Sequence, residues 1–299
     1  AVRLSGAVIG GQLNLEGARI SNPAGPALVA DYLSTRSNVM LNNGFHAEGR
    51  YGTGTIRLVG ADIGGRLMFG GGHAEGAGSD LALNLRQTHV GGDVLLPANF
   101  TTGLLALTGL TYDGMIRDAT LDELLDMFAN RTTRYTSQPY FQLAAAHQAA
   151  GHERDVRRIH VARQRDLLRR GELDARGRLW HRVTGHILGY GYRPAIALRW
   201  WVGALLLSVL LIAGVAGPAG LARTTAGHSA PCSLVAQVGL AINTVTPLVK
   251  LDAQANCQID TAAGLGQAVI VGMWVLQALG WAFVTLFITG FTGLVRRSP

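Results

Sequence analysis

The sequence predicts a mixed fold of three parts. These are an N-terminal parallel β-solenoid, a helical hairpin connector, and a C-terminal two-helix transmembrane domain with a re-entrant-like outer loop. Three observations predict it. Residues 1–114 repeat a glycine-marked apolar pattern, residues 115–195 carry arginine-rich helical patterns, and residues 196–299 contain two long uncharged apolar runs.

The repeats in residues 1–114 indicate stacked units. The segment LSGAVIGGQL at 4–13 recurs as LVGADIGGRL at 58–67, 54 residues later, and Val90–Val94 follows Ile63–Leu67 at half that displacement. Units that cannot bury an apolar face alone form solenoids by stacking. Short alternating runs and Gly-Gly turns favour strands over helices. A β-sandwich is the alternative, but the fixed displacement argues against it. Because the first coil begins at residue 1, we expect further coils upstream.

The pattern changes to helix after Ala119. Thr120 and Glu123 have the spacing of a capping box, in which each side chain bonds the other residue's backbone N–H. A second helix is expected from Ser137 to Gly151 and a third from His152 to Gly171, with its arginines facing solvent or lipid. A short amphipathic helix on the inner leaflet is expected from Trp180 to Leu188.

The positive charge is concentrated next to the first apolar run. Between His152 and Arg199 there are 12 arginines against five acidic residues, which accounts for the whole net charge of +7. A basic segment that continues into an apolar stretch is typical of a cytoplasmic juxtamembrane region, so we expect no nucleic-acid partner. The arginines expected at the membrane surface are Arg176, Arg178, Arg182, Arg193 and Arg199.

Two uncharged runs predict membrane spans. They extend from Trp200 to Ala222 and from Thr261 to Val295, with spans expected at about 200–220 and 266–294. About 20 helical residues cross a hydrocarbon core of about 30 Å. The positive-inside rule then places both termini in the cytoplasm and residues 223–262 outside the plasma (inner) membrane.

The outer loop contains a short apolar segment, Ser233–Ile242, followed by Pro247, which breaks a helix. This outline is typical of a two-span channel subunit, and under that hypothesis Thr244, Thr246 and Pro247 line the pore. The alternative is a loop packed on the ends of the spans without a pore. Since two spans cannot enclose a polar path, conduction requires a homo-oligomer.

Cys232 and Cys257 are the only cysteines, and both lie in the outer loop. An even pair in an exported segment favours a structural disulfide over two free thiols.

No motif predicts a catalytic, cofactor-binding or metal site. Gly52-Thr-Gly54 lacks the third glycine of a dinucleotide fingerprint, and His152-Glu153 lacks the second histidine of the zinc-protease motif. His46, His73 and His89 recur near coil turns without metal-ligand spacing. The sequence therefore favours a protein that is not an enzyme and carries no cofactor.

Several short blocks resemble a family of bacterial membrane proteins that join a pentapeptide-repeat-like or bactofilin-like solenoid to a helical hairpin and a two-span channel-like domain. The resemblance implies that architecture, and members of the family often carry the label membrane-associated oxidoreductase. The blocks are Leu-x-Gly-Ala-x-Ile-Gly-Gly at 4–11 and 58–65, Gln138–Tyr140, Gly189–Pro194, Pro247–Asp252, and Gly280-Trp281 through Thr285-Leu286 to Thr292–Leu294.

Together these expectations describe an integral membrane protein with a cytoplasmic β-solenoid and a channel-like domain. The expected partners of this protein are the lipid bilayer and further copies of itself. One alternative is a membrane-anchored scaffold whose solenoid binds a cytoplasmic protein partner without transport. The other is an oxidoreductase, which rests on the family label alone.

Overall fold

The computed structural model describes residues 1–49, 52–75, 80–171, 174, 177, 194–224, 230–246, 257–262 and 264–291. The chain divides into two compact units, Ala1–Arg176 and Gly177–Pro299. Each unit is considered by itself. The predicted helix at Trp180–Leu188, Pro247 and the arginines Arg176, Arg178, Arg182 and Arg193 lie outside the described residues, whereas Arg199 lies inside them and is exposed.

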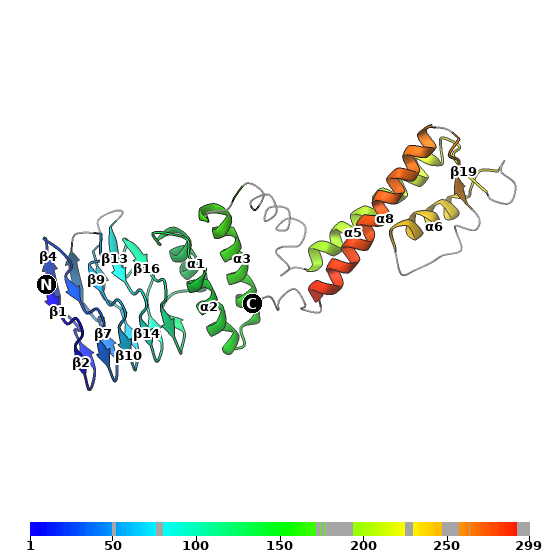
Figure 1. Cartoon of the computed structure of the whole chain (residues 1–299). Helices are drawn as coiled ribbons and strands as arrows, with labels where there is room; N and C mark the ends of the chain where they lie inside the picture. Colours follow the sequence, from blue (N-terminus) through cyan, green and yellow to red (C-terminus); the bar gives the residue numbers. More distant parts are fainter. Residues whose placement is uncertain are drawn as a thin grey trace. The chain divides into compact units, whose positions relative to one another are not determined.

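The N-terminal unit opens with a parallel β-solenoid of about four turns (Figure 1). Short strands from successive turns align in four parallel sheets. The first sheet contains β1 (Val2–Arg3), β5 (Leu28–Val29), β9 (Ile56–Arg57), β13 (Leu81–Asn84) and β16 (Leu104–Ala106). The second contains β2 (Val8–Ile9), β6 (Ser34–Thr35), β10 (Asp62–Ile63), β14 (His89–Val90) and β17 (Thr111–Tyr112). The third contains β3 (Leu13–Asn14), β7 (Val39–Met40), β11 (Leu67–Met68), β15 (Val94–Leu95) and β18 (Ile116–Arg117), and the fourth β4 (Arg19–Asn22), β8 (His46–Gly49) and β12 (His73–Ala74).

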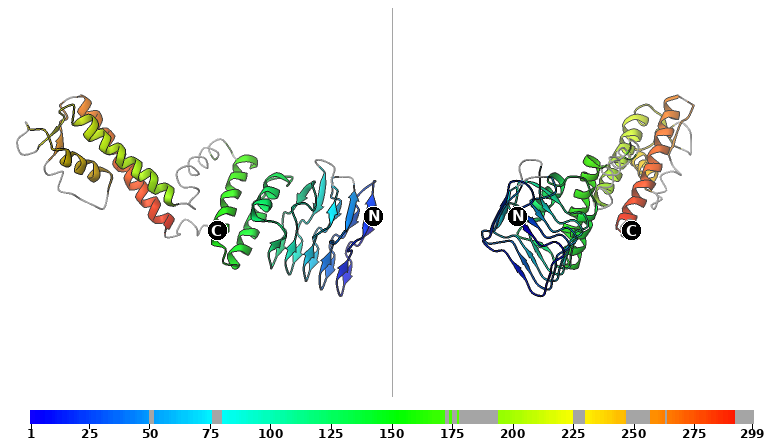
Figure 2. Two further views of the ribbon diagram at one scale, coloured as in Figure 1. Left: turned by 180° about the vertical axis from the view of Figure 1, so that it is seen from behind. Right: turned by 60° about the vertical axis from the view of Figure 1, so that its left-hand side comes forward.

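The register of these strands explains the sequence repeat. Residue 13 pairs with residue 39, residue 39 with residue 67, and residue 67 with residue 94, so each of these turns takes 26 to 28 residues. The last turn, from residue 94 to residue 116, takes 22. Two of the longer turns therefore correspond to the displacement of 54 residues between the repeated segments. The coils superimpose in the right-hand view of Figure 2. The predicted solenoid is confirmed, and the β-sandwich alternative is excluded.

The glycine of the repeated Leu-x-Gly-Ala motif has a conformational role. Gly6, Gly17 and Gly60 have φ angles of +69°, +66° and +65°, a left-handed conformation that glycine adopts without a side-chain clash. Tyr32 and Gln87 occupy the corresponding corners of other turns at φ +56°. The motif therefore recurs because the chain turns a corner there in every coil.

Three helices follow and share the core of the solenoid: α1 (Leu121–Asn130), α2 (Gln138–Ala149) and α3 (Glu153–Arg170). The predicted capping box at Thr120 and Glu123 is present at the start of α1. The side chain of Gln138 accepts a hydrogen bond from the Gly109 N–H (2.9 Å) and donates one to the Leu110 carbonyl (2.8 Å). Gln142 donates to the Tyr112 carbonyl (2.8 Å). The helices thus cap the last turn of the solenoid, where backbone groups lack a following strand.

The C-terminal unit is built from helices α5 (Pro194–Val209), α6 (Leu234–Val245) and α8 (Gly264–Phe291), the π-helical segment η2 (Leu210–Ala216), and the antiparallel strands β19 (Ala222–Arg223) and β20 (Gln258–Ile259). Among the described residues, two stretches are long and apolar enough to cross a membrane. They are Leu198–Ala216, with a mean hydropathy of 2.0, and Gly264–Thr285, with 1.8. The first helix begins at Pro194, before the predicted residue 200, because proline is well suited to a first helical turn.

The Gln138 cap predicts a specific loss of stability. We expect Gln138→Ala to lower the free energy of unfolding by about 1–3 kcal/mol, because two partly buried backbone groups lose their partner. The matched control is Gln148→Ala on the exposed face of the same helix, for which we expect a change within about 0.5 kcal/mol. Thermal unfolding of the full chain in detergent measures both, and equal midpoints for the two variants would contradict the capping role.

Candidate functional site

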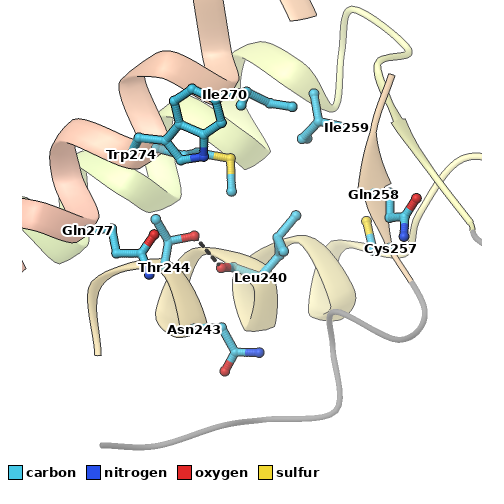
Figure 3. A pocket seen from close by; sticks show the side chains of 10 residues that line it. Leu240, Asn243, Thr244, Cys257, Gln258, Ile259, Ile270, Trp274 and Gln277 are labelled. Atoms are coloured by element: carbon cyan, nitrogen blue, oxygen red, sulfur yellow. Dashed lines mark hydrogen bonds between the residues drawn. The ribbon is translucent and has the colours of Figure 1, made fainter. Parts of the chain in front are cut away.

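A cavity of about 510 Å³ lies between α6, α8 and β20 (Figure 3). Its polar lining is formed by Asn243, Thr244, Gln258 and Gln277. Its apolar lining includes Leu240, Met273 and Trp274. Amide side chains from three separate elements thus line one cavity together with apolar side chains. Polar side chains within apolar segments of a membrane protein commonly mark functional sites.

Three hydrogen bonds hold α6 in this position. The Ser233 hydroxyl accepts from the Ala236 N–H (3.3 Å), which caps the start of the helix. The buried Ser208 hydroxyl of α5 donates to the Ala241 carbonyl (3.1 Å). The side chain of Gln237 donates to the Cys232 carbonyl (2.9 Å). The short helix is therefore fixed at its start and along its length.

Glycines permit close approach of the helices. A Cβ atom added at Gly280 of α8 would lie 2.4 Å from the Val245 carbonyl oxygen at the end of α6. One added at Gly217 would lie 2.4 Å from Oε1 of Gln237. The approach of α8 to the end of α6 therefore depends on the absence of a side chain at Gly280, whereas the neighbour of Gly217 is the end of a side chain.

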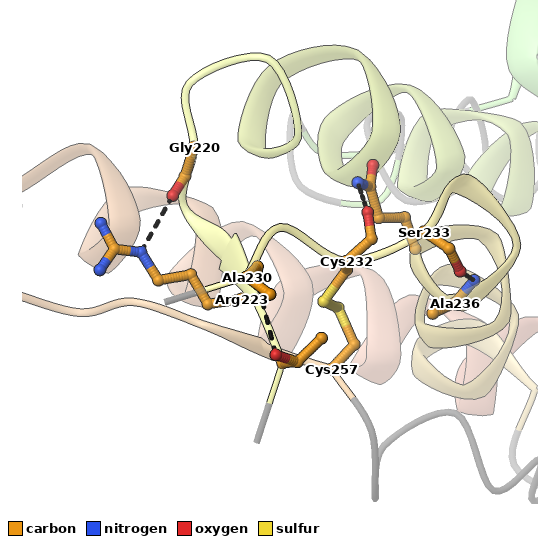
Figure 4. The surroundings of a disulfide bond; sticks show 9 residues. Gly220, Arg223, Ala230, Cys232, Ser233, Ala236 and Cys257 are labelled. Carbon is orange, nitrogen blue, oxygen red and sulfur yellow. Dashed lines mark hydrogen bonds between the residues drawn. A yellow bond between two sulfur atoms is a disulfide. The ribbon is translucent and has the colours of Figure 1, made fainter. Parts of the chain in front are cut away.

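A disulfide joins Cys232 to Cys257, with a Cα–Cα distance of 5.9 Å (Figure 4). Both cysteines are buried in a small core with Ile212, Ala222 and Leu240. Beside the bridge, Ala222 pairs with Ile259 across the strands β19 and β20, and the Arg223 guanidinium lies 3.7 Å from the Asp260 carboxylate. Closing a loop of this length stabilises a fold by roughly 3–4 kcal/mol in the chain-entropy account.

The predicted pore-lining residues have different positions. Thr244 is buried in the cavity wall, and its hydroxyl donates to the Leu240 carbonyl of its own helix (2.9 Å). Thr246 is not among the cavity-lining residues, and its hydroxyl donates to the Ile242 carbonyl. Pro247 lies outside the described residues. Sequence reasoning missed Asn243, Gln258 and Gln277; the signal available was Gln277, a polar amide within the second apolar run.

The hairpin of α2 and α3 contains a second polar cluster. Asp166 is buried and accepts hydrogen bonds from the Tyr140 hydroxyl (3.0 Å) and from Nη2 of Arg170 (2.6 Å). Burial, and next the Asp166 charge, raise the pKa of Tyr140. Arg170 also donates to the Phe128 carbonyl (2.7 Å). Arg158 pairs with Asp122 at 2.5 Å. These arginines link α3 to α1, and the Tyr140 hydroxyl links α2 to Asp166 of α3, whereas the sequence predicted that the arginines face solvent or lipid.

Within the described residues, two groups of side chains have ligand atoms close enough to hold a metal ion, within 4.8 Å of one another. One is His147, His152 and Asp155 at the hairpin turn, where burial lowers the pKa of His147. The other is His46, Glu48 and Glu75 on the fourth sheet of the solenoid.

Comparison of the chain with models of protein families, with functionally characterised proteins and with solved structures finds no match.

The close approach of α8 to α6 predicts that Gly280→Ala destabilises the C-terminal unit. The added methyl group must displace a backbone carbonyl, which typically costs about 1–3 kcal/mol. The control is Gly203→Ala in α5, where an added Cβ has nothing within 4 Å. We expect a lower unfolding midpoint for Gly280→Ala and an unchanged or higher one for Gly203→Ala, measured by circular dichroism in detergent. The reverse order would show that the two helices do not pack as described.

Proposed function

We propose that this chain is an integral membrane protein whose two apolar helices anchor a β-solenoid at the membrane. One observation carries the proposal. Only 17% and 22% of the residues in the most apolar windows of the two helices are buried. A core helix of a soluble protein of similar hydropathy would be mostly buried. Large apolar side chains instead face outward, among them Leu206 (62% exposed), Leu210 (63%) and Trp274 (65%).

The lengths of the helices agree with this function. Leu198–Ala216 contains 19 residues, which extend about 28 Å at 1.5 Å per residue. This is close to the thickness of a hydrocarbon core. Helix α6 has 12 residues, or about 18 Å, and cannot span. We therefore interpret it as a re-entrant or interfacial segment between two spans.

Two independent features support the same orientation. Arginines precede the first span, and the segment between the spans carries as many basic as acidic residues. The disulfide Cys232–Cys257 belongs to that same segment, and disulfides persist on the oxidising side of a plasma membrane. In this orientation the solenoid faces the cytoplasm, where it can bind a protein partner.

A second candidate function is conduction by a ring of several copies. The observation that favours it is the amide-lined cavity between α6 and α8. Two spans cannot enclose a polar path alone, so the cavity-bearing faces of several copies would surround it. Thr244 belongs to the cavity wall, and Thr246 and Pro247 follow it in the sequence.

The anchoring proposal predicts the sidedness of introduced cysteines. In a chain with Cys232→Ser and Cys257→Ser, we expect Ala262→Cys to react with an impermeant maleimide in intact cells. Val8→Cys, 83% exposed in the solenoid, should react only after the cells are permeabilised. The wild-type chain should remain in membranes after a carbonate wash. Release by carbonate, or labelling of Val8→Cys from outside, would refute the proposal.

The conduction candidate makes a separate prediction. Purified chain in liposomes should pass small ions, and Gln277→Leu should lower the flux several-fold because it removes an amide from the cavity lining. Gln267→Leu, an exposed position on the same helix outside that lining, should leave the flux unchanged. Liposomes that stay impermeable with wild-type chain would leave anchoring as the function and exclude conduction.

A further inference from the structure

Two adjacent turns of the solenoid carry the same four residues, His-Ala-Glu-Gly, beginning at His46 and again at His73. The strands β8 and β12 pair in parallel, with His46 opposite His73 and Ala47 opposite Ala74. Both alanines are fully buried in the solenoid core. Because side chains alternate along a strand, the residues on either side of each alanine face outward. The two histidines and the two glutamates therefore form adjacent rungs on one outer face.

The distances among three members of this group suit a shared ligand, since one ligand atom from each of His46, Glu48 and Glu75 lies within 4.8 Å of the other two. Nε2 of His46 lies 3.1 Å from Oε1 of Glu48 and 3.6 Å from Oε1 of Glu75. The rings of His46 and His73 stack with their centroids 5.7 Å apart and their planes 17° from parallel. His46, Glu48 and His73 line a surface cavity of about 400 Å³. Two imidazoles and two carboxylates are thus available from neighbouring positions.

The preceding turn shows that the solenoid itself does not require these residues. Its strand β4 pairs in the same register, with Arg19 opposite His46 and Ser21 opposite Glu48. Ile20, between them, is buried like the two alanines. The inward position therefore stays apolar in all three turns, whereas the outward positions carry histidine and glutamate only in two. Packing of the coils accounts for the inward residues but not for the repeated outward pair.

Neighbouring groups prepare one carboxylate for binding. The Ser21 hydroxyl donates to Oε2 of Glu48 (3.0 Å), on the side away from His46. A hydrogen bond that orients a carboxylate in this way is a common second-layer feature of metal sites.

We propose that His46, Glu48 and Glu75 bind one divalent transition-metal ion across two turns of the solenoid, with the neighbouring His73 turning its side chain to supply the fourth ligand and Zn²⁺ the best match. Two imidazole nitrogens and two carboxylate oxygens provide the four ligands that Zn²⁺ takes in a tetrahedral site. Alkaline-earth ions prefer all-oxygen sites, which this group does not provide. The bound ion would cross-link adjacent coils on the outer face.

The test is a titration of the full chain, purified in detergent and treated with a chelator. It uses a His152→Ala background, which removes a ligand from the hairpin cluster. Calorimetry should give one Zn²⁺ per chain, and added Co²⁺ should produce the visible absorption of a four-coordinate complex. We expect His73→Ala and Glu75→Gln each to raise the dissociation constant at least tenfold. His89→Ala, an exposed histidine on the second sheet, should not change it.

The outcomes separate this site from the other candidate. No binding in the His152→Ala background, or binding that His73→Ala and Glu75→Gln leave unchanged, would overturn the proposal. Binding by the wild-type chain that is lost with His152→Ala alone would assign the metal to the hairpin turn instead. Thermal unfolding of each metal-free variant checks that it folds. We expect unchanged midpoints, because the substituted side chains lie on the outer face of the solenoid, where Glu75 is exposed and His73 half-buried.

Discussion

The outward-facing apolar surface of α5 and α8 is the constraint on which this account depends. Burying such side chains is worth about 25 cal/mol for each Å² removed from water, and the C-terminal unit covers only a small part of them itself. Everything else in that unit is consistent with this constraint. The short helix α6 is held by Ser208 and by the close approach at Gly280, and the disulfide fixes the segment that connects the two helices.

The N-terminal unit solves a different physical problem, the open end of a backbone ladder. A parallel solenoid leaves unpaired N–H and C=O groups on its last turn, which would otherwise invite pairing with another chain. Gln138 and Gln142 satisfy some of them from α2, and Arg131 donates to the Ala98 and Thr101 carbonyls. Asp166 and Arg170, both in α3, then fasten that helix to this cap through the Tyr140 hydroxyl and the Phe128 carbonyl. Removing Arg170 would take away the closer of the two arginines that pair with the buried Asp166.

The sequence predicted those features that arise from local pattern. The displacement between Leu4–Leu13 and its copy predicted the solenoid, and Thr120 with Glu123 predicted the start of α1. The amide-lined cavity could not be predicted, because Asn243 and Gln277 come together only through the packing of α6 on α8. The histidine–glutamate group was missed for a related reason. Its ligands are distant in sequence and become neighbours only through the 27-residue register of β8 and β12.

Depth measurements on α5 test the central claim most directly. Nitroxide labels are attached at Leu206, Leu210 and Val8 in a chain whose native cysteines have been replaced, and the chain is reconstituted in liposomes. Each label then reports how exposed its position is to oxygen and to a water-soluble nickel complex. Insertion of the helix in the bilayer predicts that the labels at Leu206 and Leu210 are relaxed strongly by oxygen and weakly by nickel, whereas the label at Val8 shows the opposite. Strong relaxation by nickel at Leu206 and Leu210 would contradict the account, since it would place these side chains in water.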